Sequence, residues 1–241
     1  MTAPPFPGFR PAALTFFRGL KRNNSKSWFE ENRQVYEAEV KHPMLLLIEE
    51  IDARLGEVAP EIVGHPKRSM FRLHRDIRFS KDKSPYKTNA AVWFYHRDAG
   101  HGVGGQTAHG GAGLYFQLAP NDTFIGGGIW MPPSPTLKRL REVIAEDHET
   151  LEEIVTAPAF RRVFGTLDDS AMLTRPPRGF TPDHPAAQWL RYKSFVASAP
   201  MTVAEVQSPK LPDLIVKRYT AMLPFVRWLN TALGLRPQSR R

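Results

Sequence analysis

The sequence of 241 residues contains no cysteine. A chain without cysteine forms no disulfide, and it offers neither a thiolate nucleophile nor a cysteine-ligated zinc site. The absence agrees with a reducing compartment, where disulfides are rare. We therefore expect a cytoplasmic protein.

Long hydrophobic runs are also missing from the chain. The longest uninterrupted aliphatic stretch, Met44 to Ile48, is far shorter than the roughly 20 apolar residues that cross a bilayer. The first residues, MTAPPFPGFRPAALTFFRGLK, have no charged region ahead of an apolar segment, so they do not resemble a secretory signal. No membrane partner is expected.

Familiar catalytic and nucleotide-binding motifs are absent as well. The chain has neither a G-x-S-x-G nucleophile elbow nor a P-loop. Residues 100–105 read GHGVGG and fit G-x-G-x-x-G, but no helix is predicted after them to hold a pyrophosphate. His96, Asp98, His101 and His109 match no metal-site spacing. Neither a metal ion nor a cofactor is predicted.

Positive charge is what the chain has in excess. Lys and Arg number 33 against 24 Asp and Glu, which gives a net charge of +9. Such a protein attracts anions, among them nucleic acid, phosphorylated metabolites and acidic lipid heads. The hydrophobic fraction of 41% and the charged fraction of 24% are ordinary for a soluble globular protein. Clustering of the cations is therefore more informative than their number.

Helical and extended patterns alternate in an order that predicts the fold class. Ser27 and Glu30 have the spacing of a capping box at the start of the second helix. Helices are predicted over 10–20, 27–56 with an interruption near Pro43, 135–164 with a break at Pro158, and 213–233 with a bend at Pro224. Strands are predicted over 69–80, 90–96, 114–119, 123–130 and 192–199.

Helices at both ends therefore surround a run of short strands. This order predicts an α+β fold, in which N-terminal and C-terminal helices pack around a central, mostly antiparallel sheet. We expect one domain over residues 1–236 and a disordered basic tail over residues 237–241. The stretch 97–113, rich in Gly and His, is predicted to be a mobile loop.

The cations cluster in residues 71–89, which read FRLHRDIRFSKDKSPYKTN. Strand alternation places Arg75 on the same face as Phe71, Leu73, Ile77 and Phe79. A guanidinium keeps its proton, so Arg75 needs a carboxylate partner from elsewhere. On the other face, with Arg72 and His74, Asp76 has the geometry to hold Arg72 or Arg78 by a bidentate pair.

The loop that follows adds Lys81, Lys83 and Lys87, with Asp82 as a counter-charge and Tyr86 as an aromatic face with a hydroxyl. Pro85 stiffens its backbone. Together the strand and the loop predict a preformed cationic site for phosphate or carboxylate oxygens. The alternative is a solvated edge hairpin, in which Lys and Arg prevent sheets from associating.

Three consecutive glycines, Gly126 to Gly128, precede Ile129 and Trp130. Glycines within a strand let another backbone or a ligand approach closely. Trp130 then forms either a wall of the site or part of the core. The predicted ligand-binding residues are Arg72, Arg75, Arg78, Lys81, Lys83, Tyr86, Lys87, Gly127, Gly128 and Trp130. The candidate proton-transfer residues are Asp76 and Tyr86.

The string RLHRDIRFSKDKSPYKTN, with GAGLYFQLAP, IGGGIW and TRPPRGFTPDHP, resembles the family called domain of unknown function 2461. The resemblance runs over nearly the whole chain, including FFRGLKRNNSKSWFEENRQVYE. It implies no activity, substrate or catalytic residue, because the family has none established. Residues Arg75 to Lys87 and the glycines with Trp130 match its blocks, whereas His74 stands where relatives more often carry an aromatic residue.

Three functions remain open at this point. The first, which we favour, is binding of a phosphate-bearing ligand, either a small molecule or nucleic acid. The second is an enzyme acting on a small anionic substrate, with Asp76, a lysine or Tyr86 as acid or base. The third is a structural or partner-binding protein in which the basic segment is an ion-paired scaffold. The oligomeric state is not indicated.

Overall fold

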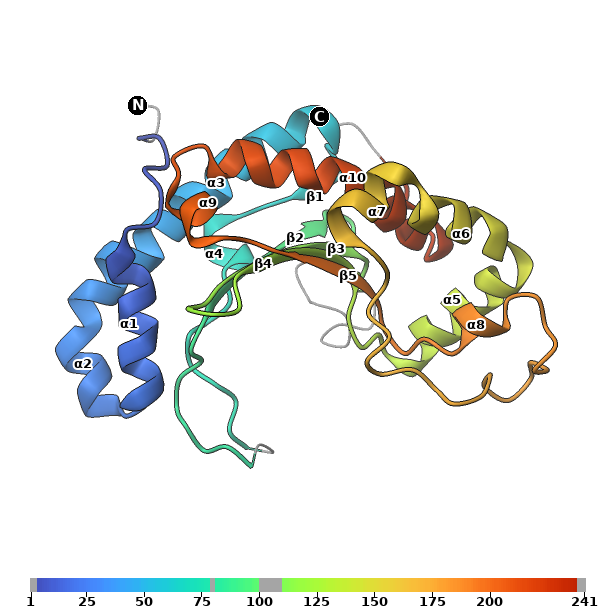
Figure 1. Cartoon of the computed structure of the whole chain (residues 1–241), viewed down its shortest axis with the longest axis horizontal. Coiled ribbons are helices and arrows are strands. Elements are labelled where there is room, and N and C mark those ends of the chain that lie inside the picture. Colours follow the sequence, from blue (N-terminus) through green and yellow to red (C-terminus); the bar gives the residue numbers. More distant parts are fainter. Residues whose placement is uncertain (1–3, 79–80, 100–109, 238–241) are drawn as a thin grey trace.

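The computed structural model describes residues 4–78, 81–99 and 110–237 of the chain. The predicted features at Phe79, in the G-x-G-x-x-G stretch, at His101 and His109, and at the end of the basic tail lie outside these residues. Helices cover one face of a sheet, and an extended segment lies beside its other face (Figure 1). The predicted α+β fold is confirmed by helices combined with one antiparallel sheet.

Within the described residues the sheet contains five strands that follow one another in chain order, and each pairs antiparallel with its neighbours. The second strand has the predicted bounds, and the predicted hairpin over 114–130 is formed by the third and fourth strands. The strands are β1 Ile62–Val63, β2 Ala90–His96, β3 Gly113–Leu118, β4 Phe124–Ile129 and β5 Phe195–Pro200.

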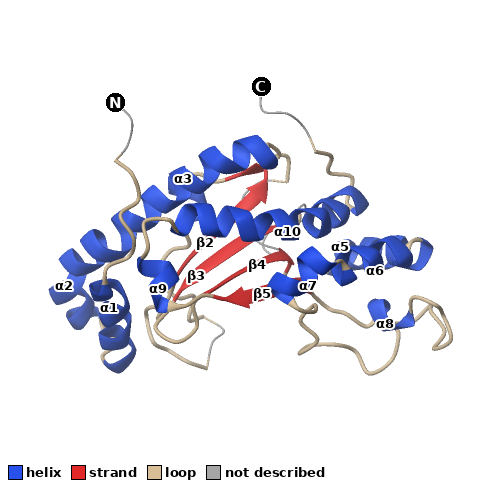
Figure 2. Cartoon of the chain, turned by 45° about the horizontal axis from the view of Figure 1, so that its top comes forward, coloured by secondary structure: helices blue, strands red, loops and turns tan. Residues whose placement is uncertain are grey.

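Two long helices, α3 His42–Val58 and α10 Leu211–Ala232, lie over one face of the sheet (Figure 2). The sheet residues beneath them belong to the hydrophobic core, and Phe94 and Phe116 are fully buried. Because strand side chains alternate between faces, the intervening residues point to the opposite face. We call that opposite side the open face.

Shorter helices flank the two long ones. In the N-terminal set α1 and α2 precede the sheet and α4 lies between β1 and β2, whereas the later set lies mostly between β4 and β5 in the chain. The N-terminal set is α1 Pro11–Arg22, α2 Lys26–Val35 and α4 Pro66–Ser69. The later set is α5 Ser134–Glu146, α6 His148–Thr156, α7 Pro158–Phe164, α8 Ala187–Leu190 and α9 Val203–Gln207.

Helices α2 and α3 are joined by a π-helical turn, η1 Tyr36–Lys41, without a break in the helical run. The backbone N–H of His42 donates to the carbonyl of Glu37, five residues earlier. A π turn holds one more residue than an α turn. The interruption predicted near Pro43 is thus a π turn that ends just before this proline. Pro43 itself is tolerated because it lies in the first turn of α3.

The cap of α2 differs from the prediction. The N-cap is Ser25, whose hydroxyl accepts from Trp28 N–H at 3.3 Å. Glu30 pairs instead with Arg33, at 2.6 Å between Oε1 and Nη2. The predicted capping box from Ser27 to Glu30 was therefore wrong. The N-cap is Ser25, and Glu30 pairs with Arg33 instead of the helix N-terminus.

The strand predicted over residues 69–80 is not formed. Ser69 ends α4, and in the described part of this segment Met70 and His74 make isolated bridges, to Val92 and Tyr86. The chain is extended without a continuous ladder, and Arg75 lies opposite Pro85, to whose carbonyl its N–H donates. Since proline has no N–H to return, regular pairing cannot continue there.

Within the described ranges, no helix combines the length and the apolar character that a membrane crossing requires.

Candidate functional site

The basic segment forms an extended arm, residues 70–78 and 81–89, that projects from the sheet below its open face (Figure 1). At its base Phe71 N–H donates to Ala91 O on β2 at 2.9 Å. Farther out, the two limbs of the arm pair with each other, and Lys87 N–H donates to Leu73 O at 2.8 Å. The arm therefore continues from the edge of β2 as an irregular hairpin.

The arm is tied to the N-terminal helices through one residue of the turn between α1 and α2. The side-chain amide of Asn24 donates to Tyr86 O at 2.9 Å and accepts from Tyr86 N–H at 3.1 Å. The Tyr86 ring stacks on Phe29 of α2, with centroids 4.6 Å apart. These contacts set the position of the arm relative to the rest of the molecule.

Arg75 is paired within the arm. Its guanidinium contacts the carboxylate of Asp82, so the predicted carboxylate partner exists and comes from the opposite limb. Ser84 donates to Asp82 from both its N–H, at 2.9 Å, and its hydroxyl, at 2.6 Å. These bonds from Ser84, followed by the pairing with Arg75, lower the pKa of Asp82 to about 2. The charge of Arg75 is thereby largely compensated.

Arg78 is paired as well. Asp76 accepts from Arg78 Nε at 3.0 Å and from Nη2 at 2.7 Å, in the bidentate geometry predicted from the sequence. Both side chains are exposed. The bonds from Arg78 lower the pKa of Asp76 to about 2. Asp76 is therefore ionised and ion-paired at neutral pH, which does not suit a proton-transfer residue.

In the described part of the arm, Lys81, Lys83 and Tyr86 are not wall residues of the cavities described below. Lys83 Nζ donates to the carbonyl of Ile77 at 2.9 Å, and Lys81 is exposed. The Tyr86 ring is 2% exposed and packs between Phe29 and His74. The expectation that Tyr86 offers a free stacking face was therefore wrong, because the ring is part of the core.

Two of the predicted cations do share a hollow, at the base of the arm. Arg72 and Lys87 line a cavity of about 190 Å³. Its other walls are Phe71, Asn89, Ala91 and Tyr115. We call this the cationic hollow. Among the described residues, neither Arg72 nor Lys87 has a carboxylate partner.

The pKa of Lys87 shows that its positive charge is unfavourable in the folded protein. Partial burial, followed by repulsion from Arg72 and Arg75, lowers the pKa of its ammonium below the ordinary value. The ammonium lies over the ring of Phe71, 5.3 Å from the centroid. A bound anion would relieve the repulsion between these cations.

A larger hollow adjoins the cationic one and shares Phe71 and Tyr115 with it. This second cavity has a volume of about 400 Å³, and we call it the aromatic hollow. Its remaining walls come from β2, β4, β5 and two connections: Trp93, Phe124, Gly126, Gly127, Gly128, Trp130, Asp168, Val196, Ala197 and Ser198. The combined site has a size typical of small-molecule pockets.

The strand register explains why the open face is hollow here. Trp93 of β2 lies opposite Tyr115 of β3, which lies opposite Gly126 of β4, which lies opposite Ser198 of β5. Two large rings are thus followed across the sheet by two small residues. The rings form one wall, and the missing side chains leave the space beside it.

Two of the predicted glycines approach other groups closely, as the sequence suggested. Gly128 has φ = +119°, and a Cβ there would lie 2.0 Å from the carbonyl of Phe195. A Cβ on Gly127 would lie 2.7 Å from Met222 of α10. Trp130 is 47% exposed and lines the aromatic hollow, so it forms a wall of the hollow and is not a core residue.

The site has opposite charges at its two sides. Arg72 and Lys87 lie on the β2 side. Asp168 lies on the β5 side, where its N–H donates to Val196 O at 2.8 Å. Three spacings between neighbouring strands separate β2 from β5, which is roughly 14 Å. A ligand that spans the site therefore meets cations at one end and a carboxylate at the other.

Polar side chains on the open face are held in one network. Gln117 Oε1 accepts from Asn89 at 2.6 Å and from the Tyr115 hydroxyl at 3.1 Å, and its amide donates to Asp122 Oδ2 at 2.8 Å. Burial, with a smaller effect of Asp122, raises the pKa of Tyr115 to about 12. Tyr115 is consequently neutral and oriented at the junction of the two hollows.

Several wall residues were missed by the sequence analysis, above all Trp93, Tyr115 and Asn89. The available signal was the pattern of β2 and β3, where large rings occupy both faces of each strand. A strand that buries one face against helices does not need rings on the other unless something covers them.

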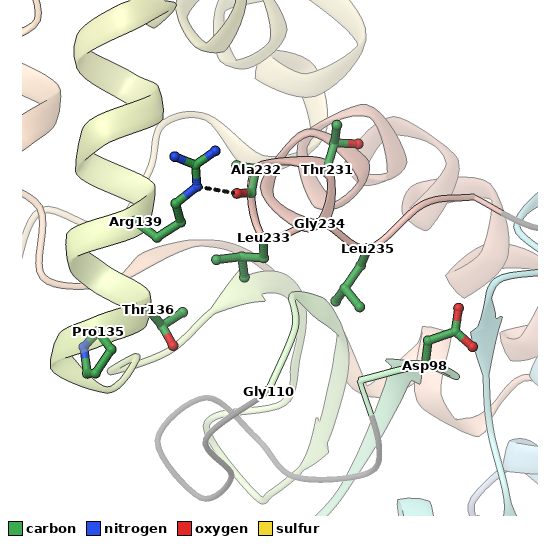
Figure 3. Close-up of a pocket in the computed structure, with 10 residues that line it drawn as sticks. All are labelled: Asp98, Gly110, Pro135, Thr136, Arg139, Thr231, Ala232, Leu233, Gly234 and Leu235. Atoms are coloured by element: carbon green, nitrogen blue, oxygen red, sulfur yellow. Dashed lines mark hydrogen bonds between the residues drawn. The ribbon is translucent and has the colours of Figure 1, made fainter.

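The other candidate sites have fewer features of an anion-binding or metal-binding site. A cavity of about 630 Å³ lies between α5 and the end of α10, where Arg139 Nε donates to Ala232 O at 3.3 Å (Figure 3). Its charged wall residues are Arg139 and Asp98, so cations do not gather there. His96 Nε2 lies 3.0 Å from Arg236 O. Among the described residues, no cluster of three or more His, Cys, Asp or Glu has a metal-binding arrangement.

Comparison with known protein families gives a match over most of the chain. A family described as "Conserved hypothetical protein (DUF2461)" matches residues 12–228. That span contains the arm, the sheet and both hollows. No curated protein and no solved structure matches the chain.

Proposed function

The chain belongs to the conserved hypothetical protein family DUF2461, whose description names no activity, and we propose that it binds an anionic, phosphate-bearing ligand on the open face of its sheet. The charged end of this ligand occupies the cationic hollow, and its less polar part occupies the aromatic hollow. The proposal thus narrows the predicted cationic site to the base of the arm.

The observation that carries this proposal is the difference between the cations of the arm. Arg75 and Arg78 are compensated by Asp82 and Asp76. Arg72 and Lys87, by contrast, share a cavity and have no carboxylate partner in the described part of the chain. Cations held close together without a direct ion pair form a preorganised anion site, because folding and not ligand binding overcomes the repulsion between them.

The adjoining aromatic hollow indicates the rest of the ligand. Its walls are mainly rings and glycines, and it is about twice as large as the cationic hollow. A free phosphate ion would leave it empty. A phosphorylated molecule with a flat or apolar portion would use both cavities, in the manner of pockets that combine apolar walls with a few polar anchors.

The test compares two double variants with the same change in charge. Arg72→Gln with Lys87→Gln removes the cations of the hollow, and Arg78→Gln with Lys83→Gln removes two cations near the tip. Binding of pyrophosphate and of ribose 5-phosphate is measured by titration calorimetry at low ionic strength. We expect the first variant to bind at least about tenfold more weakly than the wild type, while the second binds like it.

Equal losses in the two double variants would show that net charge, and not the hollow, attracts the ligand. The absence of binding by the wild-type protein at low ionic strength would also contradict the proposal. Nucleic acid as the ligand is recognised by a steep fall of affinity with salt, because several phosphates would release counterions together.

An enzymatic role has one observation in its favour, the lowered pKa of Lys87 beside other cations. A lysine of this kind serves as a base or nucleophile in some active sites. The candidates Asp76 and Tyr86 are not wall residues of either hollow. Turnover of a phosphorylated ligand that is lost in Lys87→Arg, with binding retained, would favour catalysis over binding alone.

A further inference from the structure

A third hollow continues the site toward the far end of β5. Its volume is about 420 Å³, and it shares Phe124 and Ser198 with the aromatic hollow. Residues 119–124, at the turn between β3 and β4, and residues 200–203, at the start of α9, line it. We call it the turn hollow. The cationic, aromatic and turn hollows therefore adjoin one another in that order.

The strand register shows that this order follows the sheet. Ala91, a wall residue of the cationic hollow, lies opposite Gln117 of β3. Gln117 lies opposite Phe124 of β4, and Phe124 lies opposite Pro200 of β5, a wall residue of the turn hollow. This row of residues crosses the open face beside the row that contains the two rings and two small residues. The three hollows are thus successive parts of one path from β2 to β5.

Charge is distributed unequally along this path. Arg72 and Lys87 line the cationic hollow. Among the described wall residues, the charged side chain of the aromatic hollow is Asp168, and that of the turn hollow is Asp122. Neither carboxylate forms an ion pair in the described part of the chain. The path therefore changes from positive to negative along its length.

A cation beside the turn hollow does not reverse this pattern. Arg218 of α10 donates to Pro200 O at 3.4 Å, but it is paired with Glu205 of α9. Asp122 accepts from Gln117 at 2.8 Å, which positions the carboxylate and leaves its charge in place. Exposed charges interact over a Debye length of roughly 10 Å. Asp122 and Asp168 therefore oppose a phosphate in their hollows even without touching it.

This charge pattern does not suit a chain of phosphates. Single-stranded nucleic acid carries a phosphate at every nucleotide and is bound by cations that follow its backbone. Here a second phosphate would leave Arg72 and Lys87 behind and approach Asp168 or Asp122. The rings and glycines of the aromatic hollow suit an apolar body. At the far end, Asp122 offers an acceptor to a hydroxyl group.

We infer that the ligand is a phosphomonoester with one terminal phosphate and an elongated, uncharged body. This inference rests on the proposed function, since the phosphate occupies the cationic hollow. The body lies along the aromatic hollow, and its far end enters the turn hollow with hydroxyl groups in place of a second anion. Repulsion by the two carboxylates gives specificity against ligands that are charged at both ends.

The experiment compares two probes of equal length that differ at one end. Hydroxydodecyl phosphate ends in a hydroxyl, whereas dodecanediyl bisphosphate ends in a second phosphate. Their affinities are measured by titration calorimetry at low ionic strength, below the concentrations at which they form micelles. We expect the monophosphate to bind the wild type about tenfold more tightly. The net charge of +9 would by itself favour the bisphosphate, so nonspecific attraction predicts the opposite order.

Two double variants with the same change in charge identify the carboxylates responsible. Asp122→Asn with Asp168→Asn removes the charges of the path and keeps an acceptor at each position. Glu57→Gln with Asp183→Asn removes two exposed carboxylates that line none of the three hollows. We expect the first variant to bind the bisphosphate about tenfold more tightly than the wild type does, and the second to behave like the wild type. A gain in affinity cannot result from misfolding.

Two further probes test the body of the ligand on the wild-type protein. Hydroxypropyl phosphate has the same head and a short chain, and it should bind at least about tenfold more weakly than hydroxydodecyl phosphate, because it buries little apolar surface. Hexathymidylate presents several phosphates in a row. It should bind more weakly than hydroxydodecyl phosphate at every salt concentration tested.

The outcomes separate this inference from the proposed function. If hydroxypropyl phosphate binds through Arg72 and Lys87 but the long monophosphate binds no more tightly, or the bisphosphate binds at least as tightly as that monophosphate, the inference is overturned and the proposed function stands. Equal changes in the two double variants, or tighter binding of hexathymidylate, overturn it as well. If no phosphorylated probe binds at all, both claims fail.

Discussion

The ammonium of Lys87 lies over the ring of Phe71, 5.3 Å from its centroid, and Phe71 is a wall residue of both hollows. A cation–π contact of this kind stabilises a charge that has no carboxylate beside it. It also keeps the lysine head at the boundary between the cationic and aromatic hollows. The Lys87 ammonium and the Phe71 ring are therefore in contact in the protein without a ligand.

The pH dependence of the free energy of unfolding should reveal that burial and nearby cations disfavour the charged form of Lys87. Its pKa in the folded protein is lowered from 10.5 by burial and by Arg72 and Arg75. The charged form therefore destabilises the folded state at neutral pH, and the free energy of unfolding gains a contribution as the pH rises through the lowered pKa toward 10.5. Lys87→Met should lack this gain in urea unfolding between pH 7 and 10.

The control for this change is Lys83→Met, which removes the same charge from an exposed position. The difference between the Lys87→Met and Lys83→Met proteins should narrow as the pH increases. A constant difference across that range would show that Lys87 feels no repulsion in the folded protein.

Acid should weaken the ion pairs of the arm. The pKa of Asp82 is lowered from 3.8 to about 2 by Ser84 and Arg75. Its stabilising contribution is complete above pH 3.8 and is lost as the pH falls toward 2. Asp82→Asn should therefore lower Tm slightly at pH 7, by no more than a few degrees because the pair is exposed. Near pH 2 its melting should coincide with that of the wild type, and a gap that persists there would argue against this origin.

Asn24 should be needed to hold the arm. Asn24→Ala leaves both the N–H and the carbonyl of Tyr86 without their side-chain partner. The expected loss is about 2 kcal/mol in the free energy of unfolding, measured by urea titration. Asn24→Asp keeps an acceptor for the N–H and should lie between Asn24→Ala and the wild type. If both variants unfold like the wild type, the amide does not fasten the arm.

Filling the aromatic hollow should abolish binding without unfolding the protein. Ser198 is exposed on β5 and lines the hollow. Ser198→Phe places a ring in that space, and we expect a change of less than about 0.5 kcal/mol in stability, as is usual for surface positions. Affinity for a phosphorylated ligand that binds the wild type through both hollows should fall at least about tenfold.

Ser198→Ala serves as its control, because it removes the hydroxyl and leaves the space open. Normal affinity in Ser198→Phe would place the ligand elsewhere on the protein. Titration calorimetry and a urea unfolding curve on the same preparations separate loss of binding from loss of structure.

The sequence predicted the elements whose structure depends on local signals. Strand β2 was recognised with its bounds, and β3 and β4 were recognised as a hairpin because Pro120 and Asn121 mark a turn. The helix before Asn23 followed from the spacing of Leu14, Phe17 and Leu20, which are all buried. Periodicity and turn residues were sufficient in each case.

The arm was misread because its pattern imitates a strand. Apolar and charged residues alternate from Phe71 to Ile77, but whether a ladder forms depends on the partner, and Pro85 lies opposite Arg75. The burial of Tyr86 depends on Phe29, far away in the sequence. Such contacts between distant residues leave no periodic trace, so the pattern alone placed Tyr86 in a ligand site.

The cationic cluster was recognised, but its internal pairing was only partly predicted. Asp76 and Arg78 are only two residues apart in the sequence. Their predicted bidentate pair is present in the structure. Which cations remain for a ligand depends on how the two limbs of the arm meet. That is a tertiary property: Arg75 and Arg78 are ion-paired, whereas Arg72 and Lys87 line the cationic hollow.

The π turn η1 has a consequence for this geometry. Each residue of an α-helix advances the side-chain direction by about 100°, so the additional residue in the turn re-aims everything that follows it. Phe29 on α2 can then face Tyr86 while Leu47 and Ile51 on α3 are buried in the core. Deleting a single residue between Tyr36 and Lys41 would leave α2 and α3 unchanged in length and composition. It would, however, rotate the apolar face of one helix relative to that of the other by about 100°.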